Sequence, residues 1–253
     1  MHADERQHSI LERLRADGRL DVTTLSTDLA VSPETVRRDL RLLEHNGLVR
    51  RVHGGAYPVE SPGFETTLAS RTTHNIDDKR RIAAAAAELV GDAETVFIDE
   101  GVTPQLIATS LPTARPLTVI TAALPTAAQL AEVPSLTVIL LGGRVRGRTL
   151  ATVDHWVTSM LAGFVIDLAF LGANGISREH GLTTPDPAVA SVKAQAMRSA
   201  RRRVFSGIHT KFGASSFCRF GDVRELDTIV TDTNLPASEA RRYTTCGPQV
   251  IRV

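Results

Sequence analysis

The sequence has few cysteines, no long apolar run and no surplus of charge of either sign, and each absence excludes a class of protein. Cys218 and Cys246 are too few for a disulfide framework or a four-thiolate zinc site. Apolar runs such as 83–87 and 138–141 fall far short of the roughly 18 residues that a membrane helix needs. The polar opening of the chain shows no signal-peptide pattern. We therefore expect a cytoplasmic protein that binds no membrane.

The near balance of charges limits how this chain can bind nucleic acid. Lys and Arg total 29 and Asp and Glu total 28, so the formal net charge is +1. Binding to DNA would therefore need a local basic patch rather than a basic surface overall. The length of 253 residues and the apolar fraction of 42% fit one large globular domain or two unequal ones.

The first 57 residues have the pattern of a winged helix-turn-helix domain. Ser32-Pro33 is a strong helix start, because serine caps free N–H groups and proline suits the first helical position. Asn46-Gly47 is a typical helix end. Apolar periodicity and turn signals predict helices over 4–16, 25–30 and 33–45, followed by strands over 48–52 and 56–57.

The predicted helix 33–45 has two chemically different faces. Val36, Leu40 and Leu43 recur at the spacing of a buried stripe. The segment 37–53 carries five arginines against two acids, so the basic charge is concentrated on this helix and the hairpin after it. In a helix-turn-helix the second helix of the motif enters the major groove, where arginine reads guanine and glutamate accepts from cytosine. The predicted DNA-binding residues are Ser32, Glu34, Thr35, Arg37, Arg38, Arg41, Arg50, Arg51, His53 and Gly54.

A solvated helix face with incidental arginines is the alternative interpretation, as is a winged helix that contacts protein. The later basic run at 198–203 (Arg198, Arg201, Arg202 and Arg203) is a second conceivable nucleic-acid patch. We interpret it instead as a solvated helix end, where cations complement the helix dipole.

Beyond a predicted connector at 58–75, the pattern changes to apolar strands that alternate with helices. Such alternation predicts a mostly parallel α/β sheet covered on both faces, here over residues 76–253. The predicted strands are 95–98, 117–121, 137–141, 168–171, 204–205 and 228–231, and the predicted helices are 81–90, 106–111, 122–131, 156–161 and 188–201.

Ligands of such sheets bind at the carboxyl ends of the strands, and polar residues cluster at these positions here. The segment Asp99-Glu100-Gly101 follows a strand and leads into a helix, which presents free N–H groups to an anion. Lys193 and Lys211 are the candidate cations for a phosphate, and Asp99 could accept from a sugar hydroxyl. The alternatives are a helix cap at Asp99, turns at Gly172 and Gly175, and solvated lysines.

Two sequence blocks identify a family resemblance. TVRRDL at 35–40 and RRVHGGA at 50–56, at this spacing, resemble the N-terminal domain of DeoR-family bacterial transcription regulators. Residues 64–232 resemble the DeoR-type effector domain, with matching pieces that include LLGG at 140–143 and HGLTTP at 180–185. That domain is similar in fold to ribose-5-phosphate-isomerase-like proteins and typically senses phosphorylated sugars.

The resemblance implies a repressor that binds a double-stranded DNA operator as a homodimer or homotetramer and is controlled by a small-molecule effector such as a phosphorylated sugar. It implies no cofactor. Residues 1–57 would bind DNA, and 76–253 would sense the effector and form the oligomer. The implied effector-binding residues are Asp99, Glu100, Gly101, Thr103, Gly172, Asn174, Gly175, Thr184, Lys193 and Lys211.

The sequence departs from the family pattern around this pocket. Glu100 and Val102 replace a small residue and a hydroxyl, Ile208 replaces an aspartate, and Ser191 replaces a glutamate. A carboxylate beside a phosphate costs roughly 1–4 kcal/mol at about 4 Å. Our hypothesis is therefore that the effector is not an ordinary phosphosugar: it is a less anionic or a cationic metabolite, or the pocket has lost sensing.

An isomerase-like enzyme fused to a DNA-binding module is the alternative function. Asp99 or Glu100 as base and Lys193 or Lys211 as electrophile would suit proton abstraction beside a carbonyl. Fold likeness alone does not license that function, and the sequence has no P-loop, dinucleotide fingerprint or nucleophile elbow. The eight histidines form no metal-ligand spacing, so we expect no metal. We therefore expect a regulator rather than an enzyme.

Overall fold

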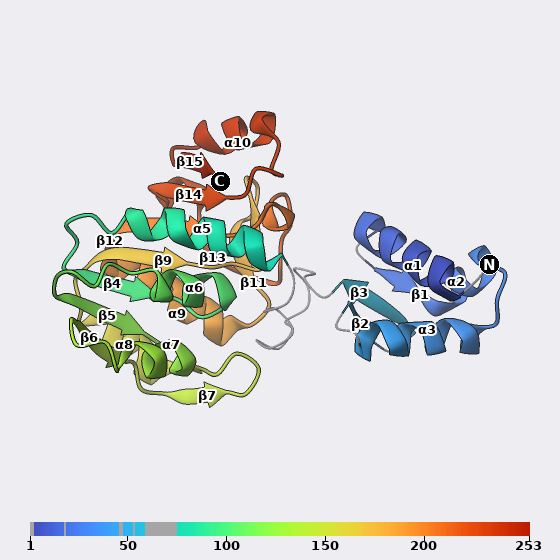
Figure 1. Cartoon of the computed structure of the whole chain (residues 1–253), viewed down its shortest axis with the longest axis horizontal. Coiled ribbons are helices and arrows are strands. Elements are labelled where there is room, and N and C mark those ends of the chain that lie inside the picture. Colours follow the sequence, from blue (N-terminus) through green and yellow to red (C-terminus); the bar gives the residue numbers. More distant parts are fainter. Residues whose placement is uncertain (1–2, 18, 46–47, 53, 59–74) are drawn as a thin grey trace. The chain divides into compact units, whose positions relative to one another are not determined.

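The computed structural model describes residues 3–17, 19–45, 48–52, 54–58 and 75–253. The chain divides into two compact units, residues 1–66 and 67–253, and each is described by itself (Figure 1). Most of the predicted connector 58–75 lies outside the described residues, so the domain limits 1–57 and 76–253 remain predictions.

The first unit is a winged helix-turn-helix domain, as predicted. Its β-strands form one antiparallel sheet in the order β1-β3-β2, which adds a strand to the predicted hairpin. Its elements are α1 (Ala3–Asp17), β1 (Leu20–Asp21), α2 (Val22–Asp28), α3 (Pro33–His45), β2 (Val49–Val52) and β3 (Gly55–Pro58).

Helix α2 begins three residues before the predicted Leu25, and the reason is a side-chain cap. One carboxylate oxygen of Asp21 accepts from the N–H groups of Thr23 and Thr24, at 2.8 and 3.3 Å. These bonds also lower the pKa of Asp21. The cap satisfies N–H groups that have no partner inside a helix.

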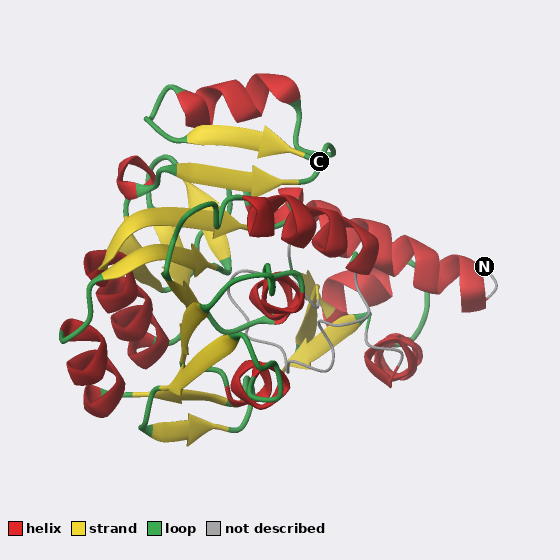
Figure 2. Ribbon diagram, turned by 60° about the vertical axis from the view of Figure 1, so that its left-hand side comes forward, coloured by secondary structure: helices red, strands yellow, loops and turns green. Residues whose placement is uncertain are grey.

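The second unit contains a seven-stranded, fully parallel sheet in the order β15-β14-β12-β9-β4-β5-β6. Helices cover it on both sides (Figure 2). The elements of the sheet and its helices are α5 (Ile76–Glu88), β4 (Thr95–Ile98), α6 (Val102–Thr109), β5 (Leu117–Thr121), α7 (Leu124–Leu130), β6 (Leu136–Leu140), α8 (His155–Ala162), β9 (Ile166–Leu171), α9 (Pro187–Ser199), β12 (Ala200–Ser206), β14 (Thr228–Thr231), α10 (Ala237–Thr244) and β15 (Gln249–Arg252).

Alternate residues of each strand feed two separate cores. On one face Val96 and Ile98 of β4 pack with α5 and α6 residues such as Ile82 and Ile107. On the other face Phe97 packs with α8 and α9 residues. This two-sided burial explains why the strand sequences are almost wholly apolar.

Several short elements that the sequence pattern did not predict lie outside the parallel sheet and its covering helices. They are the hairpin β7 (Arg144–Arg146) and β8 (Ala151–Val153), the sheet of β10 (Gly175–Ser177), β11 (Gly181–Thr184) and β13 (Cys218–Gly221), and the 3-10 turns η1 (His209–Lys211) and η2 (Val223–Glu225). The hairpin is tied to the end of β5, because the N–H of Thr152 donates to the carbonyl of Ala122 at 2.8 Å.

The interpretation of the basic run as a helix end is wrong for most of its residues. Helix α9 ends at Ser199, and residues 200–206 form β12, which pairs in parallel with β9 from Ala200 onward. Arg201 reaches across to Asp167 at 3.3 Å. Sheet pairing has overridden the helix propensity of these arginines, which is a common outcome when local preference is weak.

Candidate functional sites

Helix α3 presents its arginines outward as its two-faced pattern predicts. Val36, Leu40 and Leu43 are at most 1% exposed and belong to the core of the first unit. Arg37 and Arg38 are exposed on the other side. The helix therefore carries a basic surface on a rigid apolar base.

Ser32 caps α3 in the predicted way. Its hydroxyl oxygen accepts from the N–H of Thr35 at 3.1 Å and lies 2.9 Å from the Thr35 hydroxyl. Both side chains thus lie at the N-terminal end of α3. In helix-turn-helix complexes, the residues at this end of the second helix contact the bases.

Glu34 accepts hydrogen bonds from two of the three arginines of α3 and none from the third, Arg38. Its carboxylate accepts from Arg37 at 3.3 Å and from Arg41. These two bonds, the Arg37 bond first, lower the pKa of Glu34. Arg38 has no hydrogen bond or ion pair with any residue that the structure describes. Its exposed guanidinium thus differs from those of Arg37 and Arg41, which Glu34 holds.

The acidic residue within the TVRRDL block serves the fold. Asp39 is 4% exposed, and its carboxylate accepts two hydrogen bonds from the Arg6 guanidinium, at 2.5 and 3.1 Å. This bidentate pair joins α1 to α3 and fixes the direction in which α3 presents its exposed face.

The hairpin is joined to α3 through Arg51. The Arg51 backbone N–H donates to Glu44 at 3.1 Å, and its Nε lies 3.1 Å from the other carboxylate oxygen. Arg37, Arg51 and Gly54 line one shallow depression of about 510 Å³. Residues of α3 and of the hairpin therefore line the same depression, and two of them are arginines.

Positions 54 and 55 of the hairpin are both glycine, for two different structural reasons. Gly54 has φ +81°, which favours glycine in the tight turn. A Cβ on Gly55 would lie 2.1 Å from the carbonyl oxygen of Leu20, so β1 could not approach. Arg50 is half-buried in β2, and His53 lies outside the described residues.

In the second unit, three of the predicted effector residues meet at one point. Asp99 follows β4 and forms an ion pair with Lys193 of α9; both residues are at most 3% exposed. The same carboxylate accepts from the N–H of Gly172 at 2.9 Å, while Lys193 also donates to the Gly172 carbonyl at 3.2 Å. The Lys193 charge is thus neutralised within the protein.

The helix that follows Asp99 begins without a side-chain cap. Gly101 is the residue before α6 and has φ +114°, and it offers no side-chain cap to the helix. Thr103 is 8% exposed in the first turn. The half-buried Glu100 lies directly before this helix end, where its negative charge opposes a second anion.

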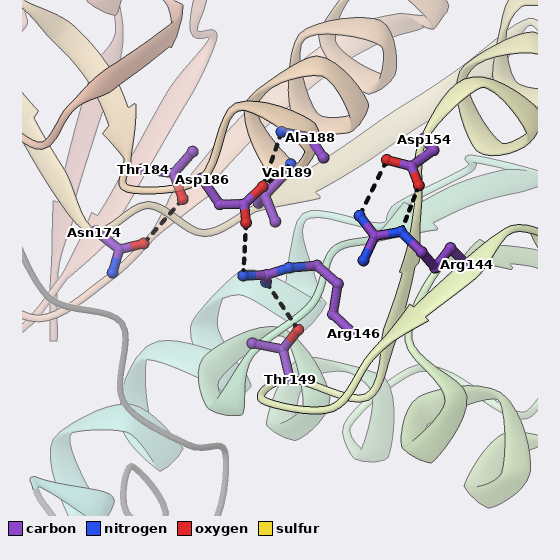
Figure 3. Close-up of polar contacts among 9 residues, drawn as sticks. All are labelled: Arg144, Arg146, Thr149, Asp154, Asn174, Thr184, Asp186, Ala188 and Val189. Atoms are coloured by element: carbon purple, nitrogen blue, oxygen red, sulfur yellow. Dashed lines mark hydrogen bonds and ion pairs between the residues drawn. The ribbon is translucent and has the colours of Figure 1, made fainter.

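Asn174 and Thr184 are also brought together, across β10 and β11. The Thr184 hydroxyl donates to the Asn174 side-chain oxygen at 3.2 Å, which orients the Asn174 amide (Figure 3). Gly175 has a packing reason, because a Cβ there would lie 2.4 Å from the carbonyl oxygen of Ala214. Lys211 is the last residue of η1 and is half-buried.

Sequence reasoning missed an arginine that the β7–β8 hairpin contributes. The Arg146 side chain is 9% exposed and donates to Asp186 at 3.0 Å and to Thr149 at 3.4 Å (Figure 3). Asp186 also caps α9 through the N–H groups of Ala188 and Val189. The only sequence signal for this hairpin is the alternation of polar and apolar residues after Gly142-Gly143. Strands of three residues are too short to be recognised from such alternation.

A pair whose contact the sequence did not predict lies at the end of β14. Asp232 is fully buried and accepts from the backbone N–H of His209 at 2.6 Å, and it lies 2.8 Å from the His209 ring Nδ1. The His209 side chain is 32% exposed, so its ring lies partly at the surface.

The charged side chains described above for this candidate site are of both signs. The acids include Asp99, Glu100, Asp186 and Asp232, and the bases include Lys193, Arg146 and Lys211. Two of these bases are already held by acids of the same site. No trio of metal-ligating side chains occurs among the described residues. None of the helices in the described part of the chain is long and apolar enough to cross a membrane.

Comparison with known proteins covers both units. Residues 6–61 match the DeoR-like helix-turn-helix domain, and residues 74–233 match the DeoR C terminal sensor domain. The HTH-type transcriptional regulator GlpR of Haloferax volcanii is 36% identical over 98% of this chain and 96% of its own length. The glycerol-3-phosphate regulon repressor of Escherichia coli (strain K12) is 29% identical over 94% of each chain.

Among solved structures, ribose 5-phosphate isomerase A of Methanocaldococcus jannaschii covers 55% of each chain with 16% identity and a TM-score of 0.39. A likeness this low carries no argument about activity. The relatives that match nearly the whole chain are transcription regulators, which favours a regulator over the isomerase-like alternative. With both of its units matched, the chain belongs to the DeoR family of DNA-binding transcription regulators, in which a C-terminal sensor domain accompanies the helix-turn-helix domain.

Proposed function

We propose that this protein is a cytoplasmic, nucleoid-associated repressor that binds a two-fold operator as a homo-oligomer. Exposed Arg38, in the second turn of a helix that is anchored by its apolar face, is the observation that supports the DNA-reading role. Arg37, Arg41 and the hairpin arginines add phosphate and base contacts. Two relatives with repressor in their names support repression as the direction of control.

We further propose that the effector is a carbohydrate derivative with little negative charge, bound at the carboxyl edge of the parallel sheet. Two observations support this choice: an extra phosphate would lie close to Glu100, and the cations Lys193 and Arg146 are already paired with Asp99 and Asp186. Asn174, Thr184 and the Arg146–Asp186 pair offer donors and acceptors suited to hydroxyl groups.

The experiment has two parts. Genome-wide mapping of bound sites identifies an operator and, through the neighbouring genes, a set of metabolites. Calorimetry of the full chain then compares glycerol 3-phosphate and ribose 5-phosphate with glycerol, ribose and the metabolites from the mapping. Micromolar binding of a simple phosphosugar would defeat the low-charge proposal, and a chain that ignores DNA would defeat the repressor proposal.

A further inference from the structure

One tryptophan occurs in the whole sequence, and it projects from the surface. Trp156 lies in the first turn of α8 and is 71% exposed. Met160, one turn later on the same helix, is 38% exposed. Contiguous exposed apolar patches, unlike apolar residues scattered singly, mark interaction sites.

A groove lies directly beside this tryptophan. Its lining residues are Gly142, Gly143, Arg144, Asp154, His155, Trp156 and Met160, and its volume is about 640 Å³. The groove is open towards solvent along its length. The patch therefore combines a projecting aromatic ring with an open hollow beside it.

The floor of the groove is open because residue 142 has no side chain. A Cβ on Gly142 would meet only the Met160 sulfur, at the ordinary distance of 3.9 Å, and the backbone there is not left-handed. Gly143 differs, since its Cβ would lie 2.5 Å from the Val153 carbonyl oxygen. Packing thus explains the second glycine, whereas the fold leaves room for a side chain at the first.

The groove also adjoins an unprotected edge of the parallel sheet. Strand β6 is the last strand on that side, and its sequence LTVIL contains no charge or proline. Leu140 at its end is 43% exposed. The opposite edge, β15, carries Arg252, which donates to the Thr233 carbonyl at 2.7 Å. Proteins normally blunt free edges with charge, so an apolar edge is expected to be covered by another chain.

We propose that this face, defined as the groove and the β6 edge beside it, binds the same face of a second copy of the chain across a two-fold axis. Each Trp156 then enters the groove of the other copy, so one patch supplies both knob and hollow, as an isologous contact requires. Arg144 and Asp154, 2.8 Å apart beside the groove, give the face both signs of charge (Figure 3). Across the axis each sign can meet its opposite.

The size of this contact fits a specific dimer. An indole buries about 150–250 Å², and a standard interface needs roughly 800 Å² from each partner. Trp156 thus supplies an anchor, and Met160, Leu140 and the β6 edge supply the surrounding area. The inference rests on the proposed function in one respect, namely that reading a two-fold operator requires paired DNA-binding units.

The single tryptophan makes the proposal measurable in the unaltered full chain without DNA. Sedimentation gives the mass over a range of concentrations, and tryptophan emission and acrylamide quenching are followed on the same samples. We expect emission to shift to shorter wavelength, and quenching to fall at least threefold, in step with dimer formation. Emission typical of an exposed indole in a fully dimeric sample would overturn the proposal, as would a monomer at every concentration.

Variants of the full chain test the same face. We expect Trp156→Glu and, independently, Gly142→Leu, which fills the groove, to raise the dimer dissociation constant at least 30-fold. Phe217→Glu is the matched control, because Phe217 is 85% exposed but does not line the groove. Circular dichroism confirms folding, and Gly142→Leu remains decisive if Trp156→Glu unfolds. Dissociation by Phe217→Glu alone would overturn the assignment.

The outcomes separate this inference from the proposed function. Dimers that bury Trp156 but fail to retain any operator would refute the repressor while supporting the interface. Specific operator binding by a chain whose Trp156 stays quenchable would refute the interface and leave the repressor standing. A blue-shifted emission without a change of mass would show a small-molecule occupant and overturn the proposal.

Discussion

Lys193 of α9 and Asp99 at the end of β4 form an ion pair with side chains only 4% and 2% exposed. The pair ties the loop before α6 to the helix on the opposite face of the sheet. Removal of one member leaves an uncompensated charge in a site closed to water, which is far costlier than removal of both.

For Lys193→Met we therefore expect a loss of about 3–5 kcal/mol in the free energy of unfolding of the second unit. The double variant Lys193→Met/Asp99→Asn should recover a large part of it, because no net charge stays buried. Urea unfolding followed by circular dichroism measures both. Equal stability of the single variant and the parent would show that the pair is not closed to water.

The bond between Arg6 and Asp39 leads to a second prediction. Asp39→Asn should destabilise the first unit by about 3 kcal/mol, because the nearly buried guanidinium loses its carboxylate. Arg13→Ala, which breaks the more exposed pair with Asp28, should cost under about 1 kcal/mol. Hydrogen exchange of α1 and α3 separates this unit from the rest of the chain, and similar protection in the two variants would contradict the prediction.

Arginines on α3 and on the hairpin should affect DNA binding differently. Arg38→Ala should weaken binding to the specific operator by about 1–3 kcal/mol while sparing random DNA. Arg51→Ala should weaken binding to every sequence and flatten its salt dependence by about one unit of slope. Arg37→Ala should also lose specific affinity and releases Glu34 from one partner.

Gel shifts at several salt concentrations measure these effects. Arg242→Ala on α10 is the control, since it removes an exposed arginine from a different part of the fold. Unchanged operator affinity in all three variants of the first unit would refute the proposal that α3 and the hairpin contact DNA.

Asp167 gives a prediction on pH. Burial raises its pKa, but hydrogen bonds from Thr95 and Glu94 and the charge of Arg201 outweigh that effect, so the pKa lies below its ordinary value of 3.8. The unfolded chain therefore binds a proton more readily than the folded one. The stabilisation is complete above about pH 5 and is lost as the pH falls through 3.8 and then through the lower folded value.

We expect Asp167→Asn to cost about 2 kcal/mol at neutral pH and to reduce the loss of stability between about pH 5 and pH 2. The control Asp92→Asn changes an exposed carboxylate nearby in the same surface depression. Unfolding curves at several pH values test this. An unaltered pH profile in Asp167→Asn would contradict it.

Long apolar patterns and chemically distinct helix faces were predictable from the sequence. The spacing of Val36, Leu40 and Leu43 predicts the buried stripe of α3, and Ser32 predicts its start, because both depend on neighbours within one helix. The candidate effector residues Asp99, Gly172 and Lys193 were also predictable from the family resemblance of the sequence. Their mutual contact and the neutralised lysine charge were not, since the three lie far apart along the chain.

By itself the sequence determined the two-unit organisation, the parallel sheet and the basic face of α3, because apolar periodicity and capping are local properties of the chain. Only the tertiary structure decided which charges are used up within the protein, where Arg146 meets Asp186, and that Trp156 stands beside a groove. These depend on which strands become neighbours, and strand neighbours such as β9 and β4 are far apart in sequence.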